Sequence, residues 1–396
     1  MMKKSVKKVM LPVMAAAMAV SFGALVSAED ETISLTVWGA EEDQTLLKEL
    51  TDNFQAAYPD QTFDIQIGVE SESTAKDTVL TDVEAAADVY AFADDQITDL
   101  VKAGALLKLD DYAEVLQMAG KTLDDVKDAN VEGSVDAATI DGGLYAFPRA
   151  ADNGYFLYYD ASVLSEEDVA SWSSLLEAAD AAGKKVGMTL ASGWYNASFF
   201  YGAGFTTGLN DDGTTAIDWN GTSADGYTGV DVVKGMLAIS GSPAFMAIAD
   251  GDISNQLASG NLAACVSGTW DAMTAQEVFG DGYAATKLPT FTVGDQEVQQ
   301  GSVAGYKYIG VNGYSENSGW AVLLADYLSN EEAQQKFFDE RESGPSNKNV
   351  GASDAIKENV ALSALAQQSE YAQAQKVGGK YWDPSQTFGE LIAQGT

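Results

Sequence analysis

Aromatic and short polar residues recur together in this sequence, at turns where a predicted β-strand or loop leads into a helix. The groups are Trp38 with Glu41, Glu42 and Asp43; Phe92 with Asp94, Asp95 and Gln96; Trp194 with Tyr195 and Asn196; Trp270 with Asp271; and Trp382 with Tyr381 and Asp383. Flat aromatic faces stack on the CH-rich face of a sugar, while carboxylates and amides hydrogen-bond to its hydroxyls. The pattern therefore favours a carbohydrate-binding surface.

Strand and helix patterns alternate along the chain, which explains how distant turns can meet. Residues 33–38 and 62–69 alternate as strands do, and residues 41–58 between them carry apolar residues at helical spacing. This β-α-β order favours a parallel sheet. Ligands of open α/β sheets bind at the carboxyl ends of the strands, so we expect the turns to line one site.

The sequence DGGLYAFPRAADNGYFLYYD, residues 141–160, is predicted to cross from one lobe to another. It holds two aromatic segments with strand character, and Pro148 must end the first strand or place it at a sheet edge. The polar residues from Arg149 to Asn153 are expected to face the space between the lobes. For Arg149, one of two arginines in the chain, an ion pair with a nearby acid is favoured over a ligand contact.

Length and composition set the class of the protein. A chain of 396 residues with 46% apolar and 20% charged residues is globular and too long for one core, so two lobes are expected. Its 22 basic and 59 acidic residues give a net charge of −37. This charge argues against binding to nucleic acid or to anionic lipid.

The chain has no histidine and one cysteine, Cys265. The missing histidine excludes Ser-His-Asp catalysis, H-E-x-x-H zinc sites and the commonest metal ligand. Cys265 lies in an apolar segment and is expected to be a small buried residue rather than a catalytic thiol. It is also too far from the N-terminus to be a lipoprotein anchor. No cofactor and no metal ion are expected.

The first 28 residues have the pattern of a signal peptide. Four lysines precede an apolar segment, and Val26, Ser27 and Ala28 supply small residues before the acidic Glu29. An uncleaved membrane anchor is the alternative. No later segment is long and apolar enough to span a bilayer. The protein is therefore predicted to be exported to the periplasm or the cell surface.

Two other function classes are compatible with the sequence. A secreted glycosidase needs two carboxylates at a fixed separation, and 59 acidic residues provide many pairs without marking one. The second class is a binding protein for another solute, such as a polyamine, iron or phosphate. Asp94, Asp95 and Asp271 suit a cationic ligand. The missing histidine disfavours iron, and the few basic residues near the turns disfavour phosphate.

Several segments together resemble the maltose-binding-protein-like family of extracellular solute-binding proteins, which serve ABC sugar importers. These segments are LTVW from Leu35, ADVYAF from Ala87, AGAL from Ala103, DGGLYAFP from Asp141, LYYD from Leu157, SGNLA from Ser259, SGTW from Ser267, KLP from Lys287 and NEEAQ from Asn330. Each motif is loose alone, but their order and spacing are specific. The resemblance covers nearly all of the chain after the signal peptide.

The resemblance implies an α/β fold with two lobes, each a mostly parallel sheet flanked by helices, joined by a hinge of crossing segments. The N-terminal lobe is expected to hold residues 29–152 and about 305–345, and the C-terminal lobe residues 153–304 and about 346–396. The resemblance implies a monomeric binding protein and not an enzyme. Such a protein delivers an oligosaccharide to a membrane permease, and a maltodextrin-like oligosaccharide is the best candidate. The family's closing helices extend further than this sequence, which indicates a shortened C-terminal end.

The resemblance also assigns ligand contacts, position by position. Carried onto this sequence they are Glu42, Asp43, Phe92, Asp95, Asn153, Trp194, Tyr195, Asn196, Trp270 and Trp382, to which the turn pattern adds Trp38 and Asp271. Gln96 stands where the maltose binder has an arginine, and Gly193 stands where it has a carboxylate. These departures preserve the expectation of oligosaccharide binding but weaken it for maltose itself.

Overall fold

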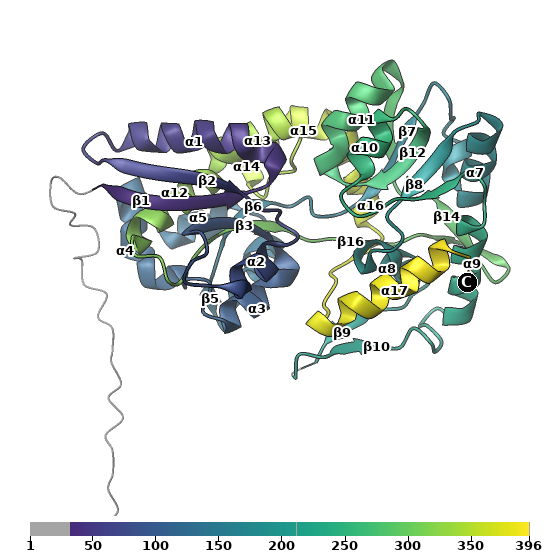
Figure 1. The fold of residues 1–396 in the computed structure, drawn as a ribbon, viewed down its shortest axis with the longest axis horizontal. Helices are drawn as coiled ribbons and strands as arrows, with labels where there is room; N and C mark the ends of the chain where they lie inside the picture. Colours follow the sequence, from purple (N-terminus) through teal and green to yellow (C-terminus); the bar gives the residue numbers. More distant parts are fainter. Residues whose placement is uncertain (1–31, 211, 396) are drawn as a thin grey trace, which may run out of the picture.

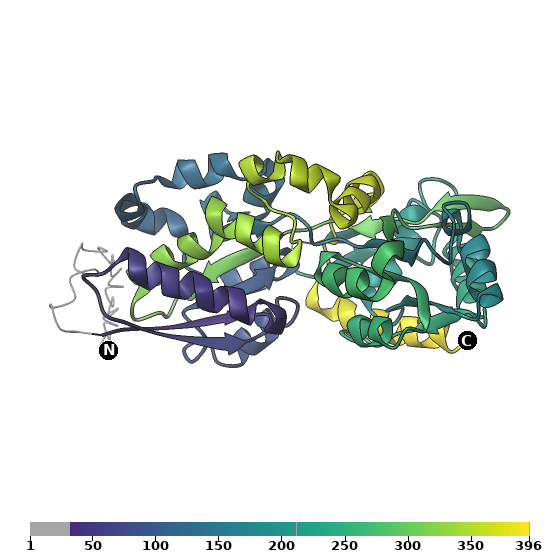
Figure 2. The same ribbon diagram turned by 90° about the horizontal axis from the view of Figure 1, so that it is seen from above.

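The computed structural model describes residues 32–210 and 212–395, which form two α/β lobes side by side (Figure 1). The view from above shows the same two bodies along the long axis (Figure 2). Each lobe holds a five-stranded sheet with helices packed around it. The predicted two-lobed fold is confirmed, whereas the predicted signal peptide, residues 1–28, lies outside the described residues.

The sheet of the first lobe has the strand order β2-β1-β3-β17-β6. Its strands are β1 (Ile33–Gly39), β2 (Phe63–Val69), β3 (Val89–Ala93), β6 (Phe147–Ala150) and β17 (Lys307–Val311). β1 is parallel to β2 and β3, whereas β17 is antiparallel to β3 and β6. Pro148 lies in β6, an edge strand, as predicted, because proline lacks the N–H that an interior strand must donate.

The sheet of the second lobe has the strand order β11-β8-β12-β7-β13. Its strands are β7 (Phe156–Asp160), β8 (Lys185–Met188), β11 (Phe245–Ala247), β12 (Leu262–Ser267) and β13 (Tyr283–Thr286). β8 is parallel to β11 and β12, whereas β7 is antiparallel to β12 and β13. Cys265 lies within β12 and is buried, as predicted.

Each sheet has one reversed strand, and that strand follows a crossing between the lobes. β7 follows the first crossing, residues 151–155, and β17 follows the second, residues 304–306. Because a reversed strand starts at the junction between the lobes, its antiparallel neighbours end there. The carboxyl ends of the other strands of both sheets therefore point to the junction, where α/β proteins bind ligands.

A third crossing runs from the end of α13 (Glu331–Arg341) through α14 (Lys348–Gly351) and α15 (Asp354–Glu358) to α16 (Val360–Ser369). Residues 354–369 form two helices rather than one, because the chain breaks between α15 and α16 at Asn359. The Asn359 side chain accepts a hydrogen bond from the Leu362 amide at 2.9 Å and so caps α16. The predicted lobe boundaries within these crossings stay a prediction.

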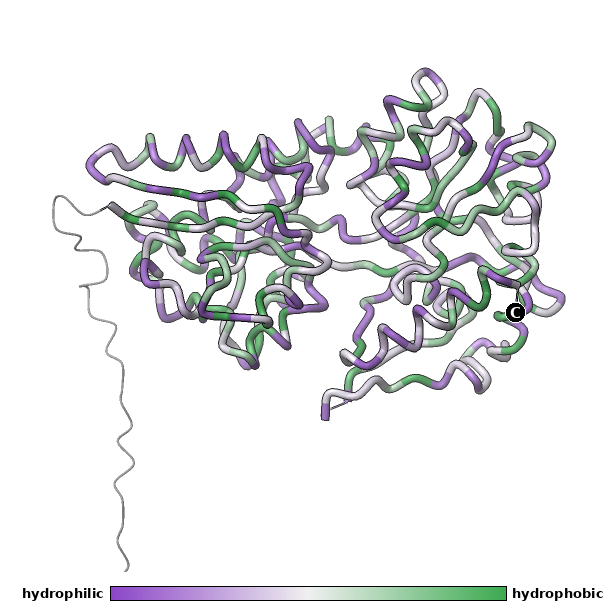
Figure 3. Tube along the Cα trace, in the orientation of Figure 1, coloured by the Kyte–Doolittle hydropathy of each residue, from purple (hydrophilic) through white to green (hydrophobic). Residues whose placement is uncertain are grey.

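Helices α1 (Gln44–Ala57) and α12 (Ser318–Ser329) pack against each other and against the first sheet. The first lobe also holds α2 (Ala75–Thr81), α3 (Ile97–Lys102), α4 (Ala113–Leu116), α5 (Leu123–Ala129), α6 (Glu132–Ala137) and α13, which packs on α1 and α12. Figure 3 shows hydrophilic and hydrophobic colour alternating within each turn of α1. This alternation marks a helix with one buried face.

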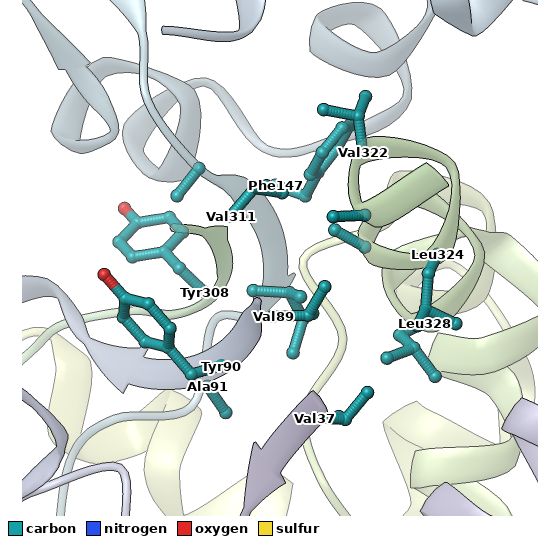
Figure 4. Close-up of a cluster of buried hydrophobic side chains, with 14 of the residues drawn as sticks. Val37, Val89, Tyr90, Ala91, Phe147, Tyr308, Val311, Val322, Leu324 and Leu328 are labelled. Atoms are coloured by element: carbon teal, nitrogen blue, oxygen red, sulfur yellow. The ribbon is translucent and has the colours of Figure 1, made fainter. Parts of the chain in front are cut away.

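One part of the core of the first lobe lies between its sheet and α12. Figure 4 shows Leu324 and Leu328 of α12 facing Val37 and Val89 of the sheet, and all four side chains are buried. The burial of such side chains from water stabilises each by about 1.5–3 kcal/mol. This core fixes the strands whose ends form the site.

The second lobe is completed by helices and small ribbons. Its helices are α7 (Trp172–Ala181), α8 (Gly193–Gly202), α9 (Gly229–Ser240), α10 (Ile253–Ala258), α11 (Ala272–Phe279), α16 and α17 (Trp382–Ala393). The hairpins are β9 (Thr207–Leu209) with β10 (Thr215–Ile217) and β14 (Thr290–Val293) with β15 (Gln296–Gln299), and β16 (Ser302–Val303) pairs with β18 (Ala372–Gln373). In the first lobe, β4 (Thr139–Ile140) pairs with β5 (Gly143–Leu144). The helix α17 packs on α8 and α9.

Candidate functional site

Trp270 lies in the turn that follows β12, at the carboxyl end of that strand. The indole ring lies directly against the backbone of Gly268, where an added Cβ would come within 2.2 Å of Trp270 Cη2. Only glycine permits this approach. The next residue, Asp271, is buried and accepts hydrogen bonds from the hydroxyls of Ser254 and Ser267. Asp271 therefore fixes the turn, and Trp270 is the residue of the pair that stays partly exposed.

Trp194 lies next to Trp270, with the ring centroids 5.7 Å apart and the planes tilted by 45°. It follows Ser192, whose hydroxyl caps the start of α8. Tyr155 packs edge-on against the Trp194 ring at 4.6 Å, and its hydroxyl donates to the Trp194 carbonyl at 2.9 Å. Trp194 is half-buried, like Trp270. The structure thus brings two predicted aromatic residues together on the second lobe.

The two residues after Trp194 point into the protein. Tyr195 and Asn196 are both buried. The Asn196 amide donates to the carbonyls of Leu190 and Ser385, at 3.3 and 2.9 Å. These bonds join α8 to the first turn of α17. The Asn196 side chain therefore acts within the fold, and neither Tyr195 nor Asn196 offers an exposed surface to a ligand in this structure.

Asp94, Asp95 and Asn153 form the polar side of the site on the first lobe. The Asn153 amide lies 3.4 Å from Asp94 Oδ1, and the Asp94 amide donates to the Tyr306 carbonyl at 3.0 Å. Desolvation raises the pKa of Asp94 to about 6. Asp95 is exposed at the level of the whole residue, but protein atoms surround its carboxyl group and remove water from it. This desolvation is the main cause that raises the pKa of Asp95 to about 7, and the charge of Asp94 adds to it. Both carboxyl groups thus have pKa values raised above the ordinary range of an aspartate.

A buried ion cluster lies at the junction behind these residues. Glu72 forms ion pairs with Arg149 and, at 3.0 Å, with Lys307. Burial opposes ionisation of Glu72, but the charges of Lys307 and Arg149 outweigh it and lower the pKa of Glu72 to about 2. The guanidinium of Arg149 also lies 4.4 Å from the centre of the Phe337 ring. The prediction that Arg149 forms a structural ion pair is confirmed.

Two residues connect this cluster to Trp270. Lys307 Nζ lies 5.2 Å from the centroid of the Trp270 ring. Asp152, in the first crossing, accepts a hydrogen bond from the hydroxyl of Thr269 at 2.7 Å. Asp152 belongs to the polar segment from Arg149 to Asn153 that was expected to face the space between the lobes, although it was not named as a ligand contact. Lys307 and Glu72 were not predicted as part of the site. These two stand far apart in the sequence, and no local motif marks them.

The predicted residues of the first turn divide between two roles. Asp43 is buried and forms an ion pair with Arg341 at 3.3 Å. Burial is the main cause that raises the pKa of Asp43. Glu42 is exposed, and its charge contributes, after burial, to the raised pKa of Asp271 on the other lobe. Glu42 therefore faces the junction, whereas Asp43 supports the first lobe.

Three predicted aromatic residues lie elsewhere. Phe92 is fully buried in the core, with ring centroids 5.9 Å from Tyr90 and 5.7 Å from Tyr308, and offers no surface to a ligand here. Trp38 is half-buried beside a depression whose lining comes entirely from the first lobe. Trp382 is half-buried at the start of α17, and its ring meets Tyr381 at 5.3 Å.

The two departures from the family pattern have structural reasons. The Gln96 amide donates to the carbonyls of Glu72 and Ser73, at 2.7 and 3.0 Å, so it holds the loop that carries Glu72. At Gly193, an added Cβ would lie 2.0 Å from the Ser385 hydroxyl oxygen. A carboxylate at this position would displace α17. Both positions therefore serve packing in this chain.

Two further observations concern the described residues only. Among the helices of residues 32–210 and 212–395, none combines the length and the apolar character needed to cross a membrane. In the same part of the chain, no group of three or more His, Cys, Asp or Glu side chains is arranged to hold a metal ion.

Residues 49–364 match the family model described as bacterial extracellular solute-binding protein. A solved structure described as a complex with acarbose is 30% identical, with a TM-score of 0.78, over 92% of this chain and 97% of that chain. The maltodextrin-binding protein MalE1 from L. casei BL23, solved without ligand, is 23% identical, with a TM-score of 0.72, over 92% and 94%. A comparison with curated protein sequences finds no match.

The maltose/maltodextrin-binding domain MalE from Bdellovibrio bacteriovorus, solved with maltotriose, is 18% identical, with a TM-score of 0.75. The alignment covers 92% of this chain and 94% of that one. At this identity, and at that of MalE1, the similarity shows a shared fold.

Proposed function

Because this chain belongs to the family of bacterial extracellular solute-binding proteins, we propose that it captures an oligosaccharide between its lobes and delivers it to the permease of an ABC importer. Maltodextrin-like oligosaccharides are the first candidates, since similar structures are described as maltodextrin-binding or were solved with acarbose or maltotriose. In this role the protein is exported, acts as a monomer and carries out no covalent chemistry.

The observation that carries the proposal is the pair of half-buried indoles of Trp194 and Trp270, 5.7 Å apart. Adjacent aromatic faces suit the apolar faces of successive sugar rings. The carboxyls of Asp94 and Asp95 and the amide of Asn153 supply acceptors and donors for hydroxyl groups from the first lobe. Glu42, on the side of the first lobe that faces the junction, is a further candidate contact.

The arrangement of the crossings favours capture by closure. Lobes joined by a few crossing segments can rotate about them, and a ligand that contacts both lobes binds the closed form better than the open form. The difference in affinity between the two forms sets how far the ligand shifts the population. A permease can then distinguish loaded from empty protein by its shape.

A cationic solute such as a polyamine is the second candidate. Asp94 and Asp95 lie side by side, and both have raised pKa values. An ammonium group placed between the two carboxyls would lower both pKa values. An oligosaccharide explains the two indoles better, because a linear amine has no ring face to stack on them.

Ligand-dependent thermal unfolding tests the proposal. A ligand that binds only the folded chain stabilises it by about 2.7 kcal/mol at one hundred times its dissociation constant. We expect the unfolding midpoint to rise with maltotriose or a related oligosaccharide and to stay unchanged with spermidine. A rise with spermidine alone would replace the first candidate by the second. Release of reducing sugar from a polysaccharide would instead make the protein a glycosidase.

A further inference from the structure

Lys307 is the one side chain of the ion cluster that contacts both lobes. It opens β17, directly after the second crossing, and it is buried. Its ammonium nitrogen lies 3.0 Å from Glu72 Oε2 on the first lobe and 5.2 Å from the centre of the Trp270 ring on the second lobe. A lysine ammonium within about 6 Å of an indole face is attracted by the ring quadrupole.

The position of the ammonium group is itself fixed. The Glu72 carboxylate is shared with Arg149, and the Gln96 amide holds the Glu72 carbonyl at 2.7 Å. A lysine side chain has several rotatable bonds, and a buried carboxylate at one place restricts them. Glu72 therefore determines where the ammonium of Lys307 meets Trp270.

Trp270 has few other restraints. Its benzo ring rests on Gly268, and the Trp194 ring touches it at a tilt. Within the described residues, the indole nitrogen of Trp270 makes no hydrogen bond to the protein. Among the residues that the structure describes, Lys307 supplies the charged contact on the ring face.

We propose that Lys307 is a positioning residue, whose ammonium group, held by Glu72, orients the Trp270 indole for the ligand. The inference rests on the proposed function only in assuming that Trp270 binds an oligosaccharide. The orientation of the Trp270 ring by Lys307 is a property of the ligand-free protein. The contact between Lys307 and Trp270 also links the end of the second crossing to the pair of Trp194 and Trp270, because Lys307 lies on β17 and β17 must move with the first lobe.

A simple structural role for Lys307 makes a different prediction. In that case Lys307 would only neutralise Glu72, and its replacement would lower stability without changing Trp270. Lys287 provides a matched control, because its ammonium lies 4.8 Å from the centre of the Tyr371 ring in the second lobe and contacts no predicted site residue.

The test compares Lys307→Met, Lys307→Arg and Lys287→Met. The emission of Trp270 is isolated by subtracting the spectrum of the matching Trp270→Phe protein in each background. We expect Lys307→Met to shift the Trp270 emission to longer wavelength, because a released ring is wetter. Lys307→Arg should restore the emission, and Lys287→Met should leave it unchanged. An unchanged Trp270 emission in a folded Lys307→Met protein would overturn the proposal.

Affinity supplies the second readout. With the oligosaccharide that stabilises wild type, Lys307→Met should bind about three- to tenfold more weakly, and Lys307→Arg should recover most of the loss. Equal affinity of Lys307→Met and wild type would also overturn the proposal. If Lys307→Met does not fold, Glu72→Gln replaces it, since it keeps the shape of the side chain and removes the charge that holds the ammonium.

The two proposals fail in different ways. Wild type that binds no oligosaccharide contradicts the proposed function, while the emission of Trp270 still tests the role of Lys307. If wild type binds sugar but the Lys307 variants keep the Trp270 emission and the affinity of wild type, only the proposed role of Lys307 is contradicted.

Discussion

The carboxylate of Asp152 accepts a hydrogen bond from the hydroxyl of Thr269 at 2.7 Å. This bond joins the first crossing to the turn that carries Trp270. The same oxygen accepts from the amide of Gly344 at 2.6 Å and the hydroxyl of Ser343 at 3.1 Å, both in the third crossing. One buried carboxylate thus connects two crossings to the second lobe.

Replacing Asp152 by alanine should destabilise the protein markedly. The change leaves the Gly344 amide and the Thr269 hydroxyl without an acceptor in a buried place, and a buried unsatisfied group costs about 1–3 kcal/mol. We expect a loss of about 3 kcal/mol in the free energy of unfolding, measured by urea denaturation. Asp60→Ala is the control, because Asp60 is exposed. Equal midpoints for the two variants would contradict this role of Asp152.

The ion pair of Arg149 with Glu72 should be worth far more than a surface pair. Removing one partner of a buried pair costs about 3–5 kcal/mol, because a charge is left uncompensated. Arg149→Met should lose about this much stability. Lys48→Met, which breaks an exposed pair with Asp52, should stay within about 0.5 kcal/mol of wild type. Similar losses in both variants would show that burial does not set the strength of the pair.

Gly193→Ala should loosen the start of α17. The new methyl group would lie 2.0 Å from the Ser385 hydroxyl oxygen and 2.7 Å from its Cβ, so the backbone must shift. Overpacking of this kind costs about 1–3 kcal/mol. Gly379→Ala, where nothing lies within 4 Å of the added Cβ, should change stability by less than about 0.5 kcal/mol. Calorimetric unfolding of both variants checks this, and a stable Gly193→Ala protein would contradict it.

The raised pKa of Asp95, about 7, predicts a pH dependence of stability. A carboxyl with a higher pKa in the folded chain than in the unfolded chain binds protons more tightly when folded. Its contribution to stability is present at low pH and is lost as pH rises from about 4 toward 7. Asp95→Asn should therefore stabilise the protein at pH 8 and have a smaller effect at pH 4.5.

The control for this prediction is Asp60→Asn, in which an exposed carboxyl is removed. The unfolding midpoint of each variant is compared with wild type from pH 4 to pH 8. A difference for Asp95→Asn that does not grow with pH would contradict the raised pKa.

The sequence predicted the elements well where local chemistry determines them. Pro148 at the edge of a sheet and the strands around the first crossing follow from backbone rules. Phe92 was misplaced for a physical reason. All five residues of β3 are buried, so this strand has no alternation that would separate a core face from a ligand face.

The parts of the site that were missed depend on tertiary contacts. Glu72 stands in a polar segment and looks like a surface residue, but its partners are 77 positions away, at Arg149, and further still, at Lys307. The break between α15 and α16 at Asn359 could have been predicted from the sequence, since asparagine is a preferred N-cap residue. Ion pairs between distant segments leave no such local signal.

The proposed function requires that the site between the lobes binds an oligosaccharide through Trp194 and Trp270. Calorimetric titration with maltotriose tests this requirement on the chain without residues 1–28, on its Trp194→Ala variant and, as a control, on Trp172→Phe in the core. We expect saturable binding of one maltotriose per chain. Trp194→Ala should weaken this binding at least tenfold, as for buried tryptophan anchors worth about 2 kcal/mol or more, and Trp172→Phe should retain it. Maltotriose binding of equal strength in wild type and Trp194→Ala would contradict it.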